Sequence, residues 1–383
     1  MNRAGFNPES DRRHTASVKW DRYGGRDVLP LWVADMDFPA PPAVVEALEQ
    51  RVAHGVFGYT HAADGLVEAF RDYALNRHGW TVEPEWLVWL PGSVPALHAA
   101  CRLIEPAHRV VSTTPIYPPF LAAPGHMERG LLEVPMLADE SGRQSFDLDA
   151  LGQAFANDGR LFYLCNPYNP GGRVFTRGEL KALGERALAH DTLVVADELH
   201  ADLVLEPGLA HQPFADLSPE LAARTITLLA PSKTFNLAGL GLACAVIPDP
   251  VVRKRFRTAI DGILPYVNAL AYTAGEAAYR DGWAWHAELI DYLRGNRDRV
   301  TEVLAGLPGI RAGATPEGTY LYWMDLRGTG NENPARHLER HGVGLADGAD
   351  FGAPGFVRLN FACSRALLDE ALARFETALA DRG

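Results

Sequence analysis

The sequence lacks several features that would mark a secreted, membrane-bound or zinc-binding protein. It has only four cysteines among 383 residues, and they form no Cys-x-x-Cys pair, which favours buried thiols in a reducing compartment over disulfides or zinc ligands. No apolar run approaches the roughly 20 residues that a membrane helix needs, and the first residues are polar. We therefore expect a cytoplasmic protein without a membrane partner or a metal.

The basic residues are also few and scattered. Lys and Arg number 36 against 48 Asp and Glu, which gives a formal net charge of −12, and no basic cluster is long enough to follow a phosphate backbone. Nucleic-acid binding is therefore not expected. An apolar content of 47% and a charged content of 22% are ordinary for a globular enzyme. Because the chain is longer than one typical core allows, we expect two packed domains.

Strand and helix patterns alternate through the middle of the chain. Apolar strand-like runs are predicted at residues 86–90, 109–113, 161–165, 192–196 and 225–229. Near-continuous apolar strands separated by helices, one of them at 177–189, favour a mostly parallel sheet covered on both faces. The predicted fold is thus α/β, with a large domain at 45–272.

A smaller α+β domain is predicted from the two ends of the chain. Beyond about residue 272 the pattern becomes helical and then includes strand-like runs at 319–324 and 355–361. We assign residues 1–44 and 273–383 to this domain. At the boundary, residues 41–51 have helical spacing, and the apolar positions that share one face of this helix are Val44, Val45, Leu48 and Val52.

Polar residues follow the predicted strands where each strand ends. Ser93, Tyr117, Asn169, Asp197 and Lys233 all lie in such positions. In an open parallel sheet the ligand binds outside the carboxyl ends of the strands. These five residues are therefore predicted to share one site.

The residue types at these strand ends suit one cofactor, pyridoxal phosphate. A buried lysine has a lowered pKa and can condense with an aldehyde, while a buried carboxylate can hold a protonated pyridine nitrogen. An aromatic ring can stack on the pyridine, and a helix N-terminus can take the phosphate. Each feature alone is weak, because an isolated Lys233 could be an ordinary loop residue and Asp197 a helix cap. Their coincidence is what favours the cofactor.

A set of motifs distributed along nearly the whole chain carries a family resemblance. They read LPLWVADMDFPAPP, VFGYT, LPGSVPAL, TPIYPPF, CNPYNPGG, VVADELHADL, APSKTFNLAGL, EGTYLYW and FVRLNFACS. In this order they resemble the fold type I pyridoxal-phosphate enzymes of the aminotransferase class I/II superfamily. Within it the chain is similar to the MalY/PatB-type branch of cystathionine β-lyases and related C–S lyases. The resemblance implies the PLP-dependent transferase fold, with a seven-stranded-type sheet in the large domain.

The resemblance also implies roles for residues around the cofactor ring. Lys233 would attach covalently to the aldehyde and later move the Cα proton. Asp197 would pair with the pyridine nitrogen, Asn169 would hydrogen-bond the 3-oxygen, and Tyr117 would stack on the ring. His200 stands where most aminotransferases carry a tyrosine directed at that same oxygen.

Further roles concern the phosphate, the substrate and the assembly. Ser93, Val94 and Ser232 would hold the phosphate. Arg358 would clamp the α-carboxylate of an amino-acid substrate through a two-pronged contact. Tyr59 would reach the phosphate from a neighbouring subunit, which implies a homodimer with composite sites.

Four positions depart from the patterns of the family. Gly241 stands where many aminotransferases carry a phosphate-binding arginine, and Ala230 where Ser or Thr is frequent. Tyr168 replaces an expected His, and Ser93 replaces a Val that is frequent in the lyase branch. The phosphate site therefore carries less charge than usual for the superfamily, which favours a lyase.

Three hypotheses of function follow. The first is a C–S β-lyase that cleaves cystathionine or a related cysteine S-conjugate to thiol, pyruvate and ammonia. The second is an aminotransferase acting on an amino acid, because the two reactions diverge only after Cα deprotonation. The third is a regulatory protein on the same fold, which is disfavoured because no residues are left over for a DNA-binding domain. A metal cluster at Asp197, Glu198, His200 and Asp202 is also disfavoured, because adjacent residues leaving a strand point apart.

Overall fold

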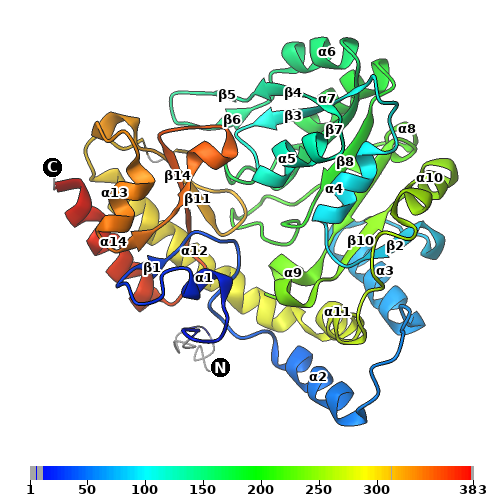
Figure 1. The fold of residues 1–383 in the computed structure, drawn as a ribbon, viewed down its shortest axis with the longest axis horizontal. Coiled ribbons are helices and arrows are strands. Elements are labelled where there is room, and N and C mark those ends of the chain that lie inside the picture. Colours follow the sequence, from blue (N-terminus) through cyan, green and yellow to red (C-terminus); the bar gives the residue numbers. More distant parts are fainter. Residues whose placement is uncertain (1–5, 7–11, 312, 381–383) are drawn as a thin grey trace.

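The computed structural model describes residue 6, residues 12–311 and residues 313–380. Figure 1 shows a large sheet wrapped by helices and, beside it, a smaller body built around a short sheet. The helices and strands of the larger body come from the middle of the chain. The smaller body combines an N-terminal segment with the C-terminal third.

The large sheet has seven strands in the order β2-β10-β9-β8-β7-β3-β4. All neighbours pair in parallel except those of β10, which is antiparallel to both β2 and β9. This arrangement confirms the predicted mostly parallel sheet. The strands are β2 (Leu87–Leu90), β10 (Ala243–Val246), β9 (Thr225–Leu229), β8 (Leu193–Asp197), β7 (Gly159–Cys165), β3 (Arg109–Thr114) and β4 (Gly130–Pro135).

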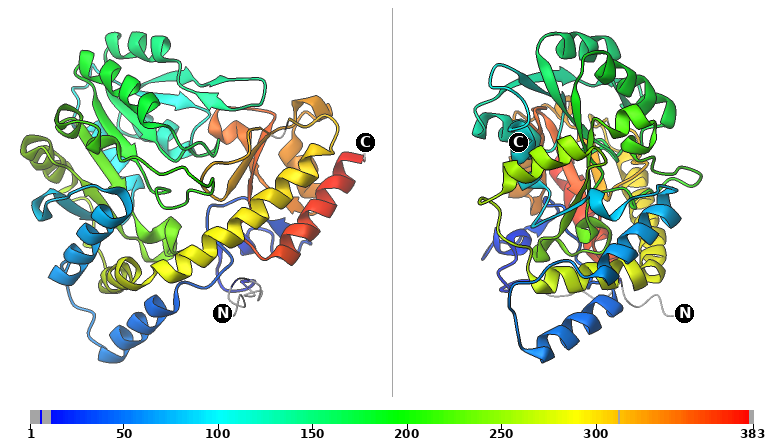
Figure 2. Two further views of the ribbon diagram at one scale, coloured as in Figure 1. Left: turned by 180° about the vertical axis from the view of Figure 1, so that it is seen from behind. Right: turned by 90° about the vertical axis from the view of Figure 1, so that its right-hand side faces the viewer.

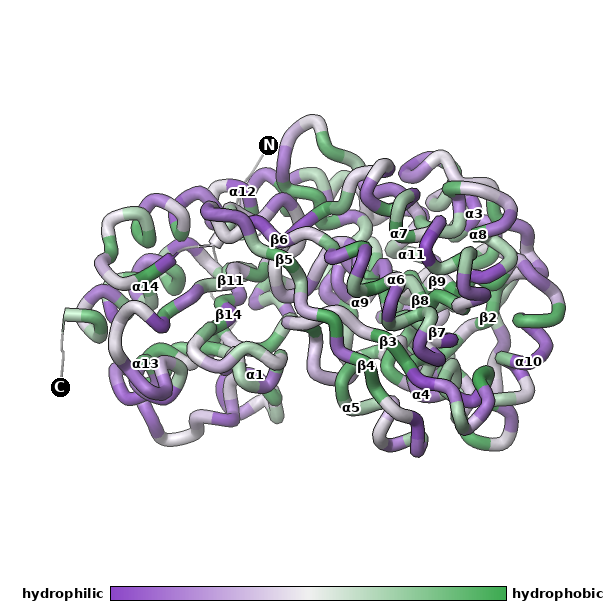
Figure 3. The backbone as a smooth tube through the Cα atoms, turned by 90° about the horizontal axis from the view of Figure 1, so that it is seen from above, coloured by the Kyte–Doolittle hydropathy of each residue, from purple (hydrophilic) through white to green (hydrophobic). Residues whose placement is uncertain are grey.

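Helices cover both faces of this sheet because its strands are apolar on both faces. Along β10, Ala243 and Ala245 join one apolar cluster, whereas Cys244 and Val246 join another on the opposite face. Figure 3 shows hydrophobic colour along the central strands, and mixed colours along the surrounding helices. The helices are α2 (Pro42–His54), α3 (Asp64–His78), α4 (Val94–Cys101), α5 (Pro118–His126), α6 (Leu148–Ala156), α7 (Arg177–Ala189), α8 (Pro219–Ala222), α9 (Pro231–Thr234), α10 (Pro250–Ile260) and α11 (Ala269–Asp281).

The smaller body surrounds an antiparallel sheet of order β11-β14-β13, and a third apolar cluster fills it. The N-terminal strand β1 pairs in parallel with β12, so the beginning of the chain is built into this body. A separate hairpin projects from the larger body and consists of β5 (Leu137–Ala138) and β6 (Gln144–Ser145). The elements of the smaller body are α1 (Val18–Asp21), β1 (Leu29–Pro30), α12 (Trp283–Ala305), β11 (Leu321–Asp325), α13 (Pro334–Arg340), β12 (Val343–Gly344), β13 (Ala346–Asp347), β14 (Phe356–Asn360) and α14 (Arg365–Ala380).

The helix α12 connects the two bodies. Figure 2 shows it running from the end of α11, next to the large sheet, to the small sheet, where it lies beside α14. Gly282 alone separates α11 from α12. A Cβ at this glycine would lie 2.6 Å from the ring of Phe235, so the close approach requires glycine. Among the described helices, including the 23-residue α12, none combines the length and apolarity needed to cross a bilayer.

The helix α2 is less buried than the sequence pattern predicts. Val44 is fully buried, but Val45 and Val52 are 41% and 53% exposed. The reason is that α2 packs on α11 along a narrow stripe and projects from the body, as Figure 1 shows. The predicted domain boundaries at residues 44/45 and 272/273 fall inside α2 and α11, and this division stays a prediction.

Candidate active site

The polar residues predicted at the strand ends meet in one cavity of about 390 Å³. It lies at the carboxyl ends of the parallel strands and is closed on the other side by the smaller body. The strand order explains this, because the loops after β2, β3, β7, β8 and β9 all leave the sheet at the same edge. The predicted residues that line the cavity are Ser93, Tyr117, Asn169, Asp197, His200, Ser232, Lys233 and Arg358.

Lys233 lies in the short helix α9, directly after β9. Its Nζ donates a hydrogen bond to the carbonyl oxygen of Ala34 at 2.6 Å. The pKa of this amine is lowered from 10.5 to about 8, mainly by burial and in addition by the charge of Arg358, while Asp35 and Asp197 oppose the change. A reactive neutral amine is therefore accessible near neutral pH.

Asp197 is the last residue of β8, and it is 7% exposed. Burial raises the pKa of its carboxyl from 3.8 to about 6, against the lowering effect of the Leu199 N–H, which donates to Oδ1 at 3.2 Å. The group is therefore ionised above about pH 6. A buried carboxylate of this kind can hold a cationic partner such as a protonated ring nitrogen.

His200 faces the same cavity. Its Nδ1 is buried and has no hydrogen-bond partner among the described residues. Burial lowers the pKa of the imidazole well below its ordinary value, and the charges of Lys233 and Arg358 act in the same direction. The ring is therefore neutral, with a polar nitrogen available to a ligand.

The acidic neighbours of His200 point elsewhere. Glu198 accepts from the Phe214 N–H at 2.8 Å and contacts His211 Nε2 at 2.9 Å, so it ties together a buried loop. Asp202 accepts from the hydroxyl of Thr234 at 3.1 Å. These contacts separate the carboxylates of the DELHAD segment, as expected for residues leaving a strand.

Arg358 lies on β14 and brings a cation from the smaller body into the cavity. Its Nη1 donates to Oδ1 of Asn169 at 2.8 Å, and its Nη2 donates to the carbonyl of Trp32 at 2.9 Å. The Nε is buried without a partner among the described residues, and the guanidinium lies 4.7 Å from the ring centre of Phe351. Burial lowers its pKa to about 10, so the group stays charged at neutral pH. Its partners are neutral oxygens, which leaves the charge available to an anionic ligand.

Another part of the cavity lining consists of main-chain groups and hydroxyls. Ser93 is the N-cap of α4 and Val94 is its first residue, so unpaired N–H groups of this helix start there. Val94 does not itself line the cavity, whereas Ser93, Ser232 and Gly241 do. Gly241 has a φ of +65°, and a Cβ there would lie 3.0 Å from the Pro91 carbonyl oxygen. The backbone is therefore shaped for glycine, and an arginine at this position would be strained.

Tyr59, a further predicted site residue, does not line the cavity. It is 93% exposed, and its ring centre is 5.5 Å from that of Tyr266. Its predicted contact needs a second subunit and stays a prediction.

The residues present fit a pyridine aldehyde phosphate. The cavity joins an amine of lowered pKa, a buried carboxylate, an aromatic side chain and an amide to the start of a helix. The unpartnered buried nitrogens of His200 and Arg358 provide independent support, because buried polar atoms are normally hydrogen-bonded.

Several cavity residues are absent from the sequence-based prediction. Trp32, Val33 and Ala34 form one wall, and Asp350 and Phe351, in the 3-10 helix η6 (Gly348–Phe351), form part of another. The sequence gives a weak signal for the first wall, because two acids interrupt the apolar run at residues 31–38. It gives none for the second.

Comparison with known proteins agrees with this site. The family described as aminotransferase class I and II matches residues 26–375. The cystathionine beta-lyase PatB of Bacillus subtilis is 41% identical over 98% of this chain and 99% of its own length. The crystal structure of OvoB is 47% identical, with a TM-score of 0.95, over 98% of this chain and all of that one.

A further solved structure contains the cofactor. Cystalysin from Treponema denticola, with pyridoxal 5'-phosphate, is 32% identical, with a TM-score of 0.94, over 99% of both chains. The likeness to this structure and to PatB confirms the predicted resemblance to the C–S lyase branch. The chain belongs to the aminotransferase class I and II family of pyridoxal-phosphate enzymes.

Proposed function

We propose that the protein is a pyridoxal-phosphate-dependent carbon–sulfur β-lyase. Its substrate would be L-cystathionine or a related cysteine S-conjugate, and its products a thiol, pyruvate and ammonia. The observation that carries the proposal is the convergence of Lys233, Asp197 and Arg358 in one cavity. The whole-chain similarity to PatB supports the choice of reaction.

Different cavity residues would bind the cofactor and the substrate. Lys233 would attach to the aldehyde, Asp197 would hold the ring nitrogen, and Tyr117 would stack on the ring. Asn169 and His200 would contact the 3-oxygen. When bound, pyridoxal phosphate supplies a protonated ring that accepts electron density from the substrate Cα.

The remaining roles concern the two anionic groups and the proton. Ser93, Val94 and Ser232 would hold the phosphate, and Arg358 the α-carboxylate. Once the amino group of the substrate has taken its place on the aldehyde, the freed amine of Lys233 would remove the Cα proton. The Cα electron pair would then form a Cα=Cβ bond while the Cβ–S bond breaks, and the electron pair of that bond would leave with sulfur as a thiolate. Water releases the remaining fragment as pyruvate and ammonia. The lowered pKa of Lys233 suits it to taking and returning a proton near neutral pH.

Asp350 suggests what the sulfur substituent carries. It lines the cavity, is exposed, and makes no hydrogen bond or ion pair with another described residue. Every other charged side chain that lines the cavity has a role in the scheme above. A carboxylate there suits a substituent with an amino group, such as the distal end of cystathionine.

We also propose that the protein works as a cytoplasmic homodimer. Large exposed apolar side chains gather on and after α2 and in the loop that precedes α11, and they would be covered by a second copy. They are Val45, Val52, Val56, Phe57, Tyr59, Ile263 and Tyr266. Tyr59 would then reach the phosphate in the partner's cavity. The four free, buried cysteines suit a reducing compartment.

The substrate assay tests the proposal. Purified protein with pyridoxal phosphate is incubated with L-cystathionine, and thiol, pyruvate and ammonia are measured together. Equal amounts of all three are expected. Amino transfer to an added keto acid without thiol would instead favour the aminotransferase, and no product from either reaction would refute the proposal.

A further inference from the structure

Residues 32–36, here called the cavity loop, include the cavity wall formed by residues 32–34, and side chains hold this loop along its whole length. The Trp32 carbonyl accepts from Arg358, and the carbonyls of Val33 and Asp35 both accept from Asn360 Nδ2 at 2.6 Å. Such an irregular segment has no ladder of its own, so its position depends on these side chains.

The centre of the cavity loop holds Lys233. The Ala34 carbonyl accepts from Lys233 Nζ and also from the hydroxyl of Tyr320 at 3.0 Å. Two residues further along, the Met36 carbonyl accepts from Arg12 Nη1 at 3.0 Å and from Asn236 Nδ2 at 3.1 Å. The reactive amine and the N-terminal segment are therefore attached to the same five residues.

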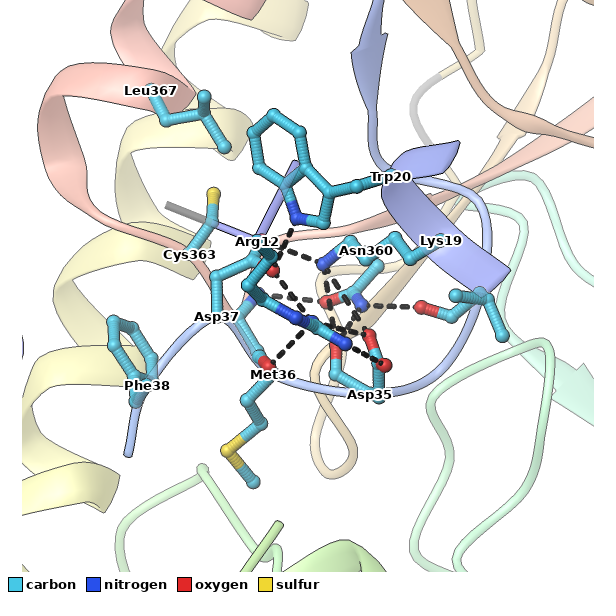
Figure 4. A network of polar contacts seen from close by, with 12 residues as sticks. Arg12, Lys19, Trp20, Asp35, Met36, Asp37, Phe38, Asn360, Cys363 and Leu367 are labelled. Atoms are coloured by element: carbon cyan, nitrogen blue, oxygen red, sulfur yellow. Dashed lines mark hydrogen bonds and ion pairs between the residues drawn. The ribbon is translucent and has the colours of Figure 1, made fainter. Parts of the chain in front are cut away.

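A cluster of four charged residues anchors the far end of the cavity loop. This ion cluster consists of Arg12, Lys19, Asp35 and Asp37 (Figure 4). Asp37 accepts from Lys19 Nζ at 2.7 Å, from Arg12 Nη1 at 2.8 Å and from Trp20 Nε1 at 2.9 Å. Arg12 also binds Asp35 through Nη2 at 2.7 Å.

The ion cluster is largely removed from water. The side chain of Lys19 is fully buried and that of Asp37 is 7% exposed, whereas those of Arg12 and Asp35 are 24% and 22% exposed. Two cations balance two carboxylates, so removal of one member leaves an uncompensated charge in a buried setting. Breaking such a cluster is strongly unfavourable. Because Asp35 lies in the cavity loop and Asp37 follows it, we expect loss of a cation to displace this loop.

We propose that Arg12 and Lys19 are positioning residues for Lys233. By fixing Asp35 and Asp37 they hold the cavity loop against the lysine, so that the Ala34 carbonyl orients Nζ and the loop keeps water from it. Neither cation lines the cavity itself. The N-terminal segment thus acts on the reactive amine through the loop.

The protonation of Lys233 is a sensitive reporter of this arrangement. The charged groups that act on the amine are Asp197 at the end of β8, Arg358 on β14 and Asp35 on the cavity loop. Two titratable groups also face it: His200, which follows β8, and Tyr320, whose hydroxyl shares the Ala34 carbonyl with Lys233. Burial has the largest effect on its pKa. Loosening the loop admits water, so the pKa should rise toward its ordinary value.

Competitive labelling of the full-length apoenzyme tests this proposal without using catalysis. Lys233 is acetylated with a trace of acetic anhydride from about pH 6 to pH 11, and the labelled peptide is quantified by mass spectrometry. The wild-type midpoint is expected near pH 8. In Arg12→Gln and Lys19→Met the midpoint is expected to rise by about one pH unit or more.

Two further variants make the result specific. Arg26→Gln removes an exposed arginine from its ion pair with Glu339 at 2.8 Å and should leave the midpoint unchanged. Arg12→Lys keeps the charge and should recover part of the wild-type midpoint. Because Arg12 is partly exposed, its variants remain testable even if Lys19→Met does not fold.

The proposal is overturned if the midpoint stays or falls in the folded variants, or if Arg26→Gln raises it equally. The inference rests on the proposed use of Lys233 as the cofactor-binding amine. The labelling experiment measures the pKa of that amine in the absence of cofactor, whereas the substrate assay measures the products of the reaction. Failure of one proposal can therefore be distinguished from failure of the other.

Discussion

The buried amine of Lys233 should destabilise the apoenzyme, and Lys233→Met should reveal this. A lowering of the pKa from 10.5 to about 8 means that the native state binds the proton less readily than the unfolded chain does. Since one pH unit is worth about 1.4 kcal/mol, the penalty amounts to about 3 kcal/mol. This is an upper bound, because Lys233 is partly exposed to the cavity.

The sign and the pH window of this effect follow from linkage. Below pH 8 both states are protonated, and the native state carries the whole penalty. Between about pH 8 and 10.5 the native amine loses its proton first, so the penalty disappears as the pH rises. The methionine variant carries no such penalty at any pH. Its advantage over the wild type should therefore be largest near pH 7 and shrink by up to about 3 kcal/mol by pH 10.5.

Urea unfolding of the two apoenzymes at equal protein concentration measures this difference. Loss of the hydrogen bond to Ala34 changes the free energy of unfolding of the variant by an amount that hardly varies with pH. The test is therefore how the difference in free energy of unfolding between the two proteins varies with pH. Lys181→Met, at an exposed position on α7, controls for loss of a surface ammonium. A difference between wild type and Lys233→Met that stays constant from pH 7 to about 10.5 would refute the reasoning.

Four other predictions follow from the site. Arg358→Lys should raise the KM for amino-acid substrates about 10- to 100-fold in steady-state kinetics, because an ammonium cannot make the two-pronged contact; an unchanged KM would contradict the clamp. Gly241→Ala should lower the free energy of unfolding by about 1–2 kcal/mol in thermal melts, because its φ is +65° and the Pro91 carbonyl is close; a wild-type melting temperature would contradict this. Asp350→Asn should raise the KM for L-cystathionine about 10-fold but not that for S-methyl-L-cysteine, and equal changes for both would argue against a contact with the distal amine. Cofactor affinity, measured by absorbance titration of the apoenzyme, should fall as the pH drops through about 6, because Asp197 then becomes protonated; constant affinity from pH 5 to 8 would be inconsistent with that role.

The local patterns predict the elements of the larger body well. The strand at 225–229 and the helix at 177–189 have the predicted bounds. The helix begins at a capping box in which Thr176 and Glu179 bond each other's main-chain N–H groups. The strand is buried at every residue, with Ile226 and Leu228 packed in one apolar cluster and Leu229 in another. The rule that ligands lie at the carboxyl ends of parallel strands then places Asp197 and Lys233 together.

The second wall of the site could not be read from the sequence in the same way. The cavity loop takes its position from partners such as Lys233 and Asn360, which are about 200 and more than 300 residues away in the chain. No periodicity encodes such pairings. The exposure of Val45 and Val52 could not be predicted from the sequence pattern either. An apolar stripe on a helix predicts that the stripe is covered, but not whether the same chain or another molecule covers it.

The single continuous helix between the two bodies has a mechanical consequence. At about 1.5 Å per residue, the 23 residues of α12 form a rod of about 34 Å. Its first turn packs on the large body through Trp283, whereas Leu293 and Val300 pack in the smaller one. A change of about 5° in the angle at Gly282 would displace the far end of this lever by about 3 Å. Small repacking around Phe235, two residues after Lys233, would thus be magnified where the smaller body meets the cavity.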